Sequence, residues 1–157
     1  MADGVFNVSK GSVAAYHNRV NDGDPSTSRL VIVGLASSGL VTDATMKDYP
    51  TLAAVLAGAS DECTNTNYAR KILTSADIAG TTIDHTNDWV TADTADQTWA
   101  TVVNDGTLAW GKLLFCYDPV AGSGTDSEII PLTYHDFAVT PNGGSITAPV
   151  SDYFKAA

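Results

Sequence analysis

The chain has 157 residues, of which 44% are hydrophobic and only 17% are charged, and its formal net charge is −10. This length suits one domain with a core of its own. The acidic balance excludes a protein that binds mainly nucleic acid, because tracking phosphates requires clustered Lys and Arg.

The opening residues, MADGVFNVSK, lack the apolar segment of a signal peptide, so we expect synthesis in the cytoplasm. The apolar stretches further along the chain are too short to cross a bilayer, and we expect no membrane contact. Cys63 and Cys116 have no CxxC spacing and no neighbouring histidines. Since cytoplasmic synthesis disfavours disulfides, we expect two buried free thiols.

The first half of the chain predicts two short helices with a buried strand between them. Residues 13–20 place apolar side chains at helical spacing, and residues 30–33 form a run of Leu, Val and Ile typical of a buried strand. A second helix is expected over residues 49–57, with Asp48 as its cap and Pro50 in its first turn.

From about residue 64 the pattern changes to strands and turns. Residues 98–103 and 108–117 predict a hairpin, because the Asn-Asp-Gly sequence at 104–106 joins two β-rich runs. A long strand is expected over residues 129–140, where Pro131 requires an edge position or a bulge. Shorter strands are expected at residues 81–85 and 145–150.

Together these elements predict an α+β, β-rich domain with a mainly antiparallel β-sandwich or barrel-like core and two short helices in its first half. We assign residues 1–11 to an N-terminal arm, 12–150 to a single globular domain and 151–157 to a C-terminal tail. Aromatic residues in the tail suggest that it docks onto another surface.

Catalytic motifs are lacking. His17, His85 and His135 are candidate bases, but the chain has no G-x-S-x-G nucleophile elbow. His135 is followed directly by Asp136, and adjacent residues of a strand point to opposite faces, so this pair is poorly placed to act together. We expect structural or surface histidines, no catalytic residue and no enzyme.

Two further patterns resemble ligand sites without completing them. Residues 106–112 nearly spell a phosphate-binding loop, but Leu113 stands where Ser or Thr must hold magnesium. Asp84 and Asp88 begin a calcium-like spacing, in which Trp89 occupies the position that requires Gly. We expect no cofactor and no metal. The acidic loop is then a solvated one, with an adventitious divalent ion as the alternative.

Charge and aromatic residues point instead to a binding surface. Residues 72–157 contain two basic and eleven acidic side chains, which either serve solubility or dock against a basic partner. Trp89, Trp99 and Trp110 gather in the middle third of the chain. They belong either to the core or to an anchor patch, since Trp is enriched at interaction hot spots, and carbohydrate stacking is a further alternative.

Three segments of the chain resemble small virion proteins that tailed bacteriophages encode near their head genes. These segments are GVFNVSKGSVAAYHNRV, LLFCYDPVAGSGTDSEIIPLTYHDFAVTPNGGSITA and the closing DYFKAA. The likeness spans most of the chain and is best between residues 113 and 147. The likeness rests on the overall similarity of these segments and includes no catalytic signature.

This resemblance implies a structural role on the particle, as a head decoration (cement) protein bound outside the major capsid shell. Its partners would be the major capsid protein and copies of itself, at the capsid exterior of the virion. A minor tail or head–tail connector protein is the alternative, and a host-surface or carbohydrate-binding module is another. The candidate contact residues, in the arm, the tail and the acidic loop, are Val5, Phe6, Val8, Trp89, Tyr153 and Phe154.

Overall fold

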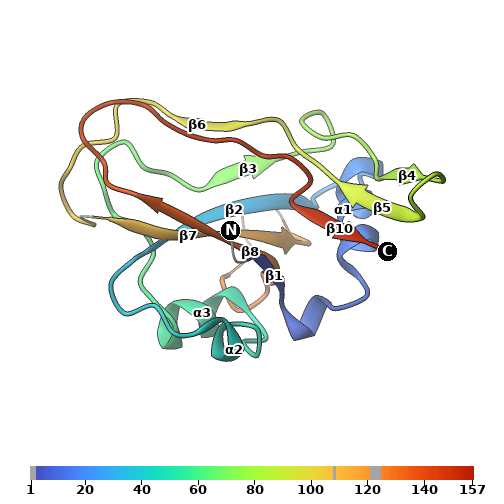
Figure 1. Ribbon diagram of the computed structural model, residues 1–157, viewed down its shortest axis with the longest axis horizontal. Helices are drawn as coiled ribbons and strands as arrows, with labels where there is room; N and C mark the ends of the chain where they lie inside the picture. Colours follow the sequence, from blue (N-terminus) through green and yellow to red (C-terminus); the bar gives the residue numbers. More distant parts are fainter. Residues whose placement is uncertain (1–2, 108, 121–124) are drawn as a thin grey trace.

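The fold is built on a five-stranded antiparallel sheet. The computed structural model describes residues 3–107, 109–120 and 125–157 (Figure 1). The strand order is β1-β8-β7-β2-β3, so β7 lies between β8, the next strand along the chain, and β2 from the first half of the chain. The five strands are β1 (Asp3–Val5), β8 (Ile130–Val139), β7 (Trp110–Asp118), β2 (Arg29–Ala36) and β3 (Lys71–Leu73).

Two small antiparallel sheets complete the strands. One has the order β10-β5-β4, and the other pairs β6 with β9. The hairpin of β4 and β5 projects from one end of the molecule (Figure 1). The five strands are β4 (Thr82–Asp84), β5 (Trp89–Ala92), β6 (Gln97–Trp99), β9 (Ile146–Ala148) and β10 (Phe154–Ala156).

Helices and small sheets cover opposite faces of the large sheet. Helices α2 and α3 lie against one face, below the sheet in Figure 1, while α1 and the small sheets lie on the other side. Among the described residues, none of these helices has the length and apolar character needed to cross a membrane. The helical elements are the 3-10 turn η1 (Asn7–Ser9), α1 (Val13–Asp22), α2 (Asp43–Met46) and α3 (Leu52–Gly58).

Alternation along β7 divides the interior into two hydrophobic clusters. Leu114 and Cys116 belong to the cluster under α2 and α3, whereas Leu113 and Phe115 belong to the cluster under α1 and the small sheets. Successive side chains of a strand point to opposite faces, so one strand contributes to both. The predicted β-rich α+β architecture is confirmed.

The helix predictions hold in outline and fail at the ends. The helix predicted over residues 13–20 is confirmed as α1, which continues to Asp22, but α3 begins only at Leu52. Thr51, not Asp48, caps it, since the Thr51 hydroxyl accepts a hydrogen bond from the Ala54 amide at 3.2 Å. Pro50 disfavours helical geometry at the preceding residue, which is why the helix starts after it. The short helix α2 was not predicted.

The predicted hairpin of residues 98–103 with 108–117 is wrong. Strand β6 pairs with β9, and β7 lies between β2 and β8. The carboxylate of Asp105 instead accepts hydrogen bonds from the Thr66 amide at 2.8 Å and the Thr66 hydroxyl at 2.7 Å, so the Asn-Asp-Gly segment packs on another loop. Position 108, where we expected the second strand to begin, lies outside the described residues.

Pro131 occupies the kind of position that its missing N–H demands. The register of β7 against β8 shifts between Phe115 and Cys116, and Cys116 is the partner of Pro131. On its other side, the pairing of β8 with β1 covers residues 133–135 among the described residues. Pro131 therefore lies next to a bulge and beyond the short edge strand, as the sequence predicted.

Both chain ends are parts of the fold rather than an arm and a tail. Residues 3–5 pair with β8, and Phe6 directly after them is completely buried. Residues 154–156 pair with β5, and Tyr153 before them is 4% exposed. The expected exposure of Phe6 and Tyr153 is wrong, because each large ring fills space over a face of the central sheet.

Replacing Phe6 tests whether the N-terminal segment contributes to stability. Phe6→Ala is expected to lower the free energy of unfolding by about 3–5 kcal/mol, the usual cost of removing a buried ring. The matched control is Val8→Ala two residues away, which removes a side chain that is 45% exposed and should change stability by no more than about 0.5 kcal/mol. Urea unfolding of both variants measures the difference, and equal stability of the two would show that residues 3–9 form a loose arm after all.

Candidate functional site

The structure brings several of the predicted contact residues together where the two chain ends meet. Val5, Tyr153 and Phe154 line a cavity of about 220 Å³ together with Lys155. We call this region the terminal junction, and define it as the surface formed by β1, residues 149–155 and the adjoining part of β5. Val8 lies away from it, beside α2, where the Asn7 amide donates to the Lys47 carbonyl.

A second cavity lies along the other side of the C-terminal segment. Its volume is about 350 Å³, and Phe115, His135 and Phe137 of the central sheet line it together with residues 148–153. Tyr153 borders both cavities. The C-terminal segment therefore crosses one face of the central sheet between two cavities, and the ring of Tyr153 holds it there.

Tyr153 is the anchor of this segment. Its ring stacks in parallel on Phe115, with 4.4 Å between the ring centroids and an interplanar angle of 4°. Its hydroxyl lies 2.9 Å from Nδ1 of His17 on α1. Burial raises the pKa of Tyr153, so the hydroxyl keeps its proton and can donate it to the imidazole.

The protonation of His17 follows from its second partner. Nε2 lies 2.6 Å from the Ala79 carbonyl oxygen, which can only accept, so Nε2 carries the hydrogen and Nδ1 accepts from Tyr153. Burial lowers the pKa of His17, and the opposing effects of the Ala79 hydrogen bond and the Asp93 charge do not outweigh it. A neutral imidazole thus joins α1, the loop at residue 79 and the C-terminal segment.

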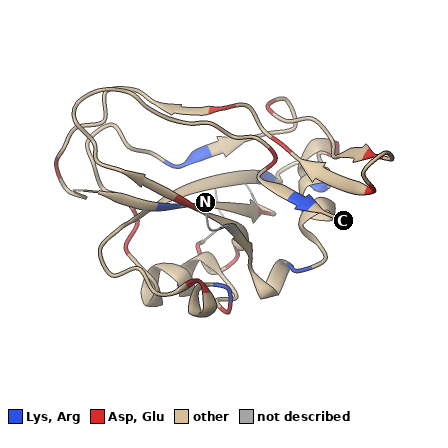
Figure 2. Ribbon diagram, in the orientation of Figure 1, with Lys and Arg blue, Asp and Glu red and all other residues tan. Residues whose placement is uncertain are grey.

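Carboxylates beside the junction bind the backbone and leave the surface acidic. Asp93 accepts a hydrogen bond from the Asp152 amide at 3.2 Å, and Asp96 accepts one from the Val150 amide at 2.9 Å. All three aspartates are exposed. Figure 2 shows acidic positions in red along these loops and on the β4–β5 hairpin. The junction therefore presents negative charge while its apolar rings are mostly covered.

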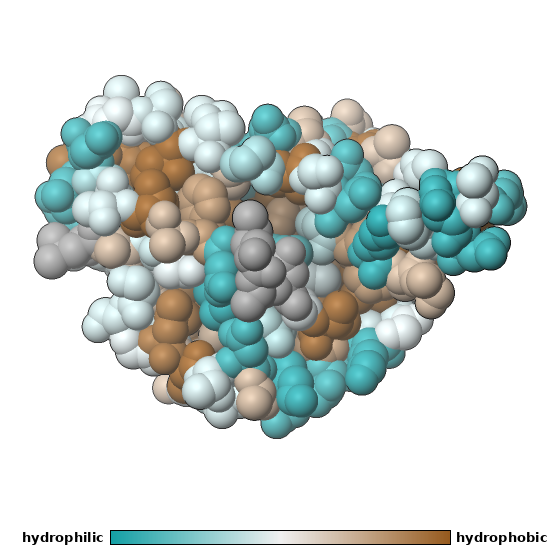
Figure 3. Space-filling view, in the orientation of Figure 1, coloured by the Kyte–Doolittle hydropathy of each residue, from teal (hydrophilic) through white to brown (hydrophobic). Residues whose placement is uncertain are grey.

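The projecting hairpin is polar, and one face of its tryptophan contacts another residue of the chain. Hydrophilic residues dominate it in Figure 3. Asp84 closes its turn by accepting hydrogen bonds from the Thr86 and Asn87 amides at 2.8 and 3.1 Å. Trp89 is half-buried, and the Lys155 ammonium lies over its ring. One face of this indole is thus already engaged within the chain.

The other two tryptophans belong to the core, which confirms the packing interpretation for them. Trp110 is completely buried and Trp99 is 2% exposed, and their rings meet edge to face at 5.3 Å. Trp110 Nε1 donates to the Asn65 side chain at 2.7 Å, and Trp99 Nε1 donates to the Ala69 carbonyl at 2.7 Å. Both indole hydrogens are therefore satisfied inside the protein.

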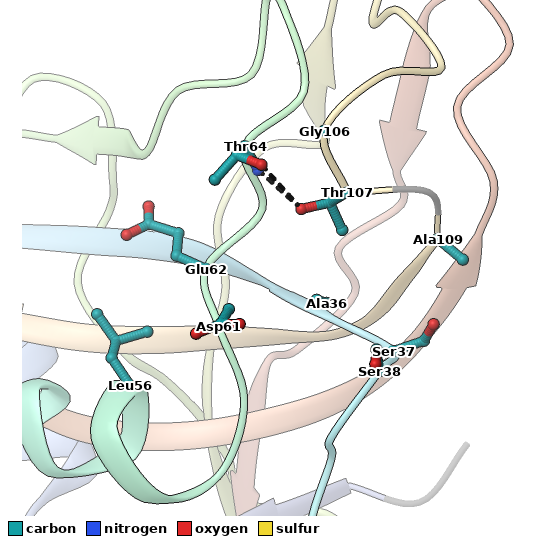
Figure 4. Close-up of a pocket in the computed structure, with 10 residues that line it drawn as sticks. All are labelled: Ala36, Ser37, Ser38, Leu56, Asp61, Glu62, Thr64, Gly106, Thr107 and Ala109. Atoms are coloured by element: carbon teal, nitrogen blue, oxygen red, sulfur yellow. Dashed lines mark hydrogen bonds between the residues drawn. The ribbon is translucent and has the colours of Figure 1, made fainter.

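A larger cavity, of about 840 Å³, lies elsewhere, between the end of β2, the loop after α3 and residues 106, 107 and 109 (Figure 4). Among the residues that the structure describes there, none is a His, Cys or Lys. The carboxylate of Glu62 accepts from Arg70 Nε and from the Tyr68 hydroxyl, each at 2.9 Å. This cavity offers hydroxyls and carboxylates without a nucleophile and base in contact.

The remaining motifs have structural roles. Lys112, which suggested a phosphate loop, lies within β7 and pairs with carboxylates of α2 and β8. Within the described residues no cluster of metal-ligating side chains occurs. Cys63 and Cys116 are free and buried, as predicted. Burial, assisted by the charge of Glu62, raises the pKa of the Cys63 thiol to about 12, so it is not a ready nucleophile.

A scan against protein-family models and searches of curated proteins and of solved structures each found no match to this chain. Function is therefore inferred from the residues and their geometry.

Sequence reasoning missed the role of His17, although a signal was present. His17 falls on the same helical stripe as Val13 and Val20, and a histidine on an apolar stripe indicates a buried ring that needs partners. Its partners lie 62 and 136 residues away along the chain. No local pattern identifies contacts at such separations.

The buried His17 predicts that stability falls in mild acid. The unfolded chain binds a proton at His17 near pH 6.5, whereas the folded protein resists it, so this stabilisation is present above about pH 6.5 and is lost as the pH falls below it. Thermal melting between about pH 7.5 and 5 should therefore show a steeper decline for the wild type than for His17→Gln. The exposed His85→Gln is the control and should follow the wild type. Identical pH profiles for the wild type and His17→Gln would contradict the assignment.

Proposed function

We propose that this protein is a structural component of a bacteriophage virion, a decoration protein that binds the outside of the major capsid shell. The resemblance of three chain segments to small virion proteins supports this role. So do the buried, structural positions of one histidine, both thiols and two tryptophans, which are His17, Cys63, Cys116, Trp99 and Trp110.

The terminal junction is the surface that we assign to capsid binding. The observation that carries this assignment is the convergence of the two chain ends beside Asp93, Asp96 and Asp152. Partly buried apolar residues there, Val5 and Phe154, adjoin a strongly acidic rim. Such a surface is complementary to a basic patch with small apolar contacts. We accordingly propose a basic region of the shell as its partner.

Repeated copies are part of this proposal. A shell offers the same site many times by symmetry, and neighbouring copies that touch one another gain avidity. A compact domain whose two ends are both tied into sheets loses little conformational entropy when it binds.

Reconstitution on heads that lack the protein tests the role directly. The purified protein is incubated with such heads, and occupancy is measured by sedimentation and cryo-imaging. Saturable binding at symmetry-related positions is expected. Absence from heads together with presence in tail fractions would overturn the proposal in favour of a tail or connector protein. Binding to a glycan array that Trp89→Ala abolishes would instead indicate a carbohydrate-binding module.

Charge neutralisation tests the surface. The triple change Asp93→Asn, Asp96→Asn and Asp152→Asn removes three negative charges, while each amide oxygen can still accept a backbone hydrogen bond. We expect head binding to weaken by on the order of tenfold, with a smaller dependence on salt than in the wild type. The matched control neutralises three exposed aspartates elsewhere, Asp22, Asp48 and Asp61. Equal weakening in both triple variants would show that net charge matters and the junction does not.

A further inference from the structure

Lys112 is buried in the middle of the central sheet. Its side chain is 6% exposed, and it lies on the face of β7 that α2 and α3 cover. Lysine is almost never buried to this extent without a partner, because removing an ammonium group from water is costly. The surroundings of its Nζ atom therefore require an explanation.

Two carboxylates meet this one ammonium. Asp136 is the direct cross-strand partner of Lys112 on β8, and its Oδ1 contacts Nζ. Asp43, the first residue of α2, places its Oδ1 2.9 Å from the same Nζ. The ring of Tyr134 lies 5.4 Å from Nζ and covers it from one side. An amine, a neighbouring carboxyl and a second carboxyl are thus held at one point.

Both carboxylates contact this one ammonium, so Nζ lies within hydrogen-bond reach of Asp136 and of Asp43. Titratable groups in such direct contact are coupled, and a proton can pass between them. Burial lowers the pKa of Lys112, but the hydrogen bonds that Nζ donates to Asp136 and Asp43 outweigh it and raise the pKa overall. The ammonium is therefore the resting form, and the neutral amine arises as a minor species when the Nζ proton passes to the touching carboxylate.

We propose that Lys112 and Asp136 condense into an intramolecular isopeptide bond, with Asp43 as the proton-relaying group. The Nζ proton first passes to the Asp136 carboxylate, which gives a neutral amine and a carboxylic acid. The Nζ lone pair then attacks Cγ of Asp136, and a C–N bond forms. Asp43 takes a proton from the attacking nitrogen and returns it to the departing hydroxyl, so the C–O bond breaks and one water leaves. No oxidant, cofactor or second substrate is needed.

The fold supplies what this reaction needs most, which is position. Strands β7 and β8 hold the two side chains opposite each other in a fixed register. Such fixed proximity gives intramolecular reactions effective concentrations of about 10⁵ M or more, which offsets the tendency of water to hydrolyse an amide. Asp136 is 44% exposed, so the product water has a route to solvent. The product would tie the two longest strands together covalently.

Intact-mass measurement of the denatured full-length protein tests this inference. The expected mass is lower than that of the sequence by one water. A peptide digest should contain one branched species, in which the Lys112 peptide is joined to the Asp136 peptide and trypsin fails to cleave after Lys112. Asp136→Asn is expected to lose ammonia instead of water. In Asp43→Ala, the cross-linked fraction should rise at least tenfold more slowly after refolding.

Two variants separate the bond from other losses of water. Lys112→Arg should show the full sequence mass. Lys71→Arg should still lose one water, because the Nζ atom of Lys71 donates to the Thr98 carbonyl and lies over the Trp99 ring, away from the cluster. A water loss that persists in Lys112→Arg would assign it to dehydration of another aspartate and overturn the proposal. The full sequence mass in wild-type protein, both fresh and after prolonged incubation, would overturn it as well. The wild-type digest decides the matter even if a variant fails to fold.

Discussion

Burial of β7 on both faces is the constraint on which the rest of this structure depends. Every residue from 112 to 118 is buried, and alternate side chains enter two separate clusters. A strand of this kind is stable only if both sides of its sheet are covered. One cover is α2 with α3 and Phe6, and the other is α1 with the small sheets and Tyr153. Phe6 and Tyr153, which lie near the two chain ends, are buried because they pack within these two covering layers.

Polar groups inside this framework connect its irregular segments. The Nδ2 atom of Asn65 lies within hydrogen-bond distance of the Val103, Asp105 and Thr107 carbonyls, which share its two hydrogens, and its Oδ1 atom accepts from Trp110. One side chain thus fixes a long segment without regular structure. His17 does the same for the C-terminal segment. Buried polar groups are costly when unsatisfied, so each such group specifies one arrangement of the loops around it.

Acidic residues have two roles near the terminal junction. Asp93 and Asp96 hold backbone amides of the C-terminal segment, and they also give the surface its charge. The excess of acidic residues in the second half of the chain is therefore structural as well as electrostatic. This matters for the proposed capsid binding, since a surface whose charges are fixed by backbone hydrogen bonds presents its field in one geometry.

Local chemistry determined the individual elements that the sequence predicted well. Helix α1 follows from its apolar spacing and the Gly23 after it, which adopts the left-handed conformation at the helix end. Strand β2 follows from its β-branched residues, and the bulge near Pro131 follows from the missing N–H. These features depend on interactions within a few residues, which a single sequence displays directly.

Only the tertiary structure decided which strands pair and which aromatic residues are exposed. The sequence singled out Phe6 and Tyr153 as aromatic and terminal, but the two covers of β7 bury them. It joined two strands across the turn at 104–106, whereas β7 pairs with the longer strands β2 and β8. The terminal junction joins residues from both ends of the chain. Strand pairing and burial are set by which distant apolar faces cover one another, and local propensity carries no information about that choice.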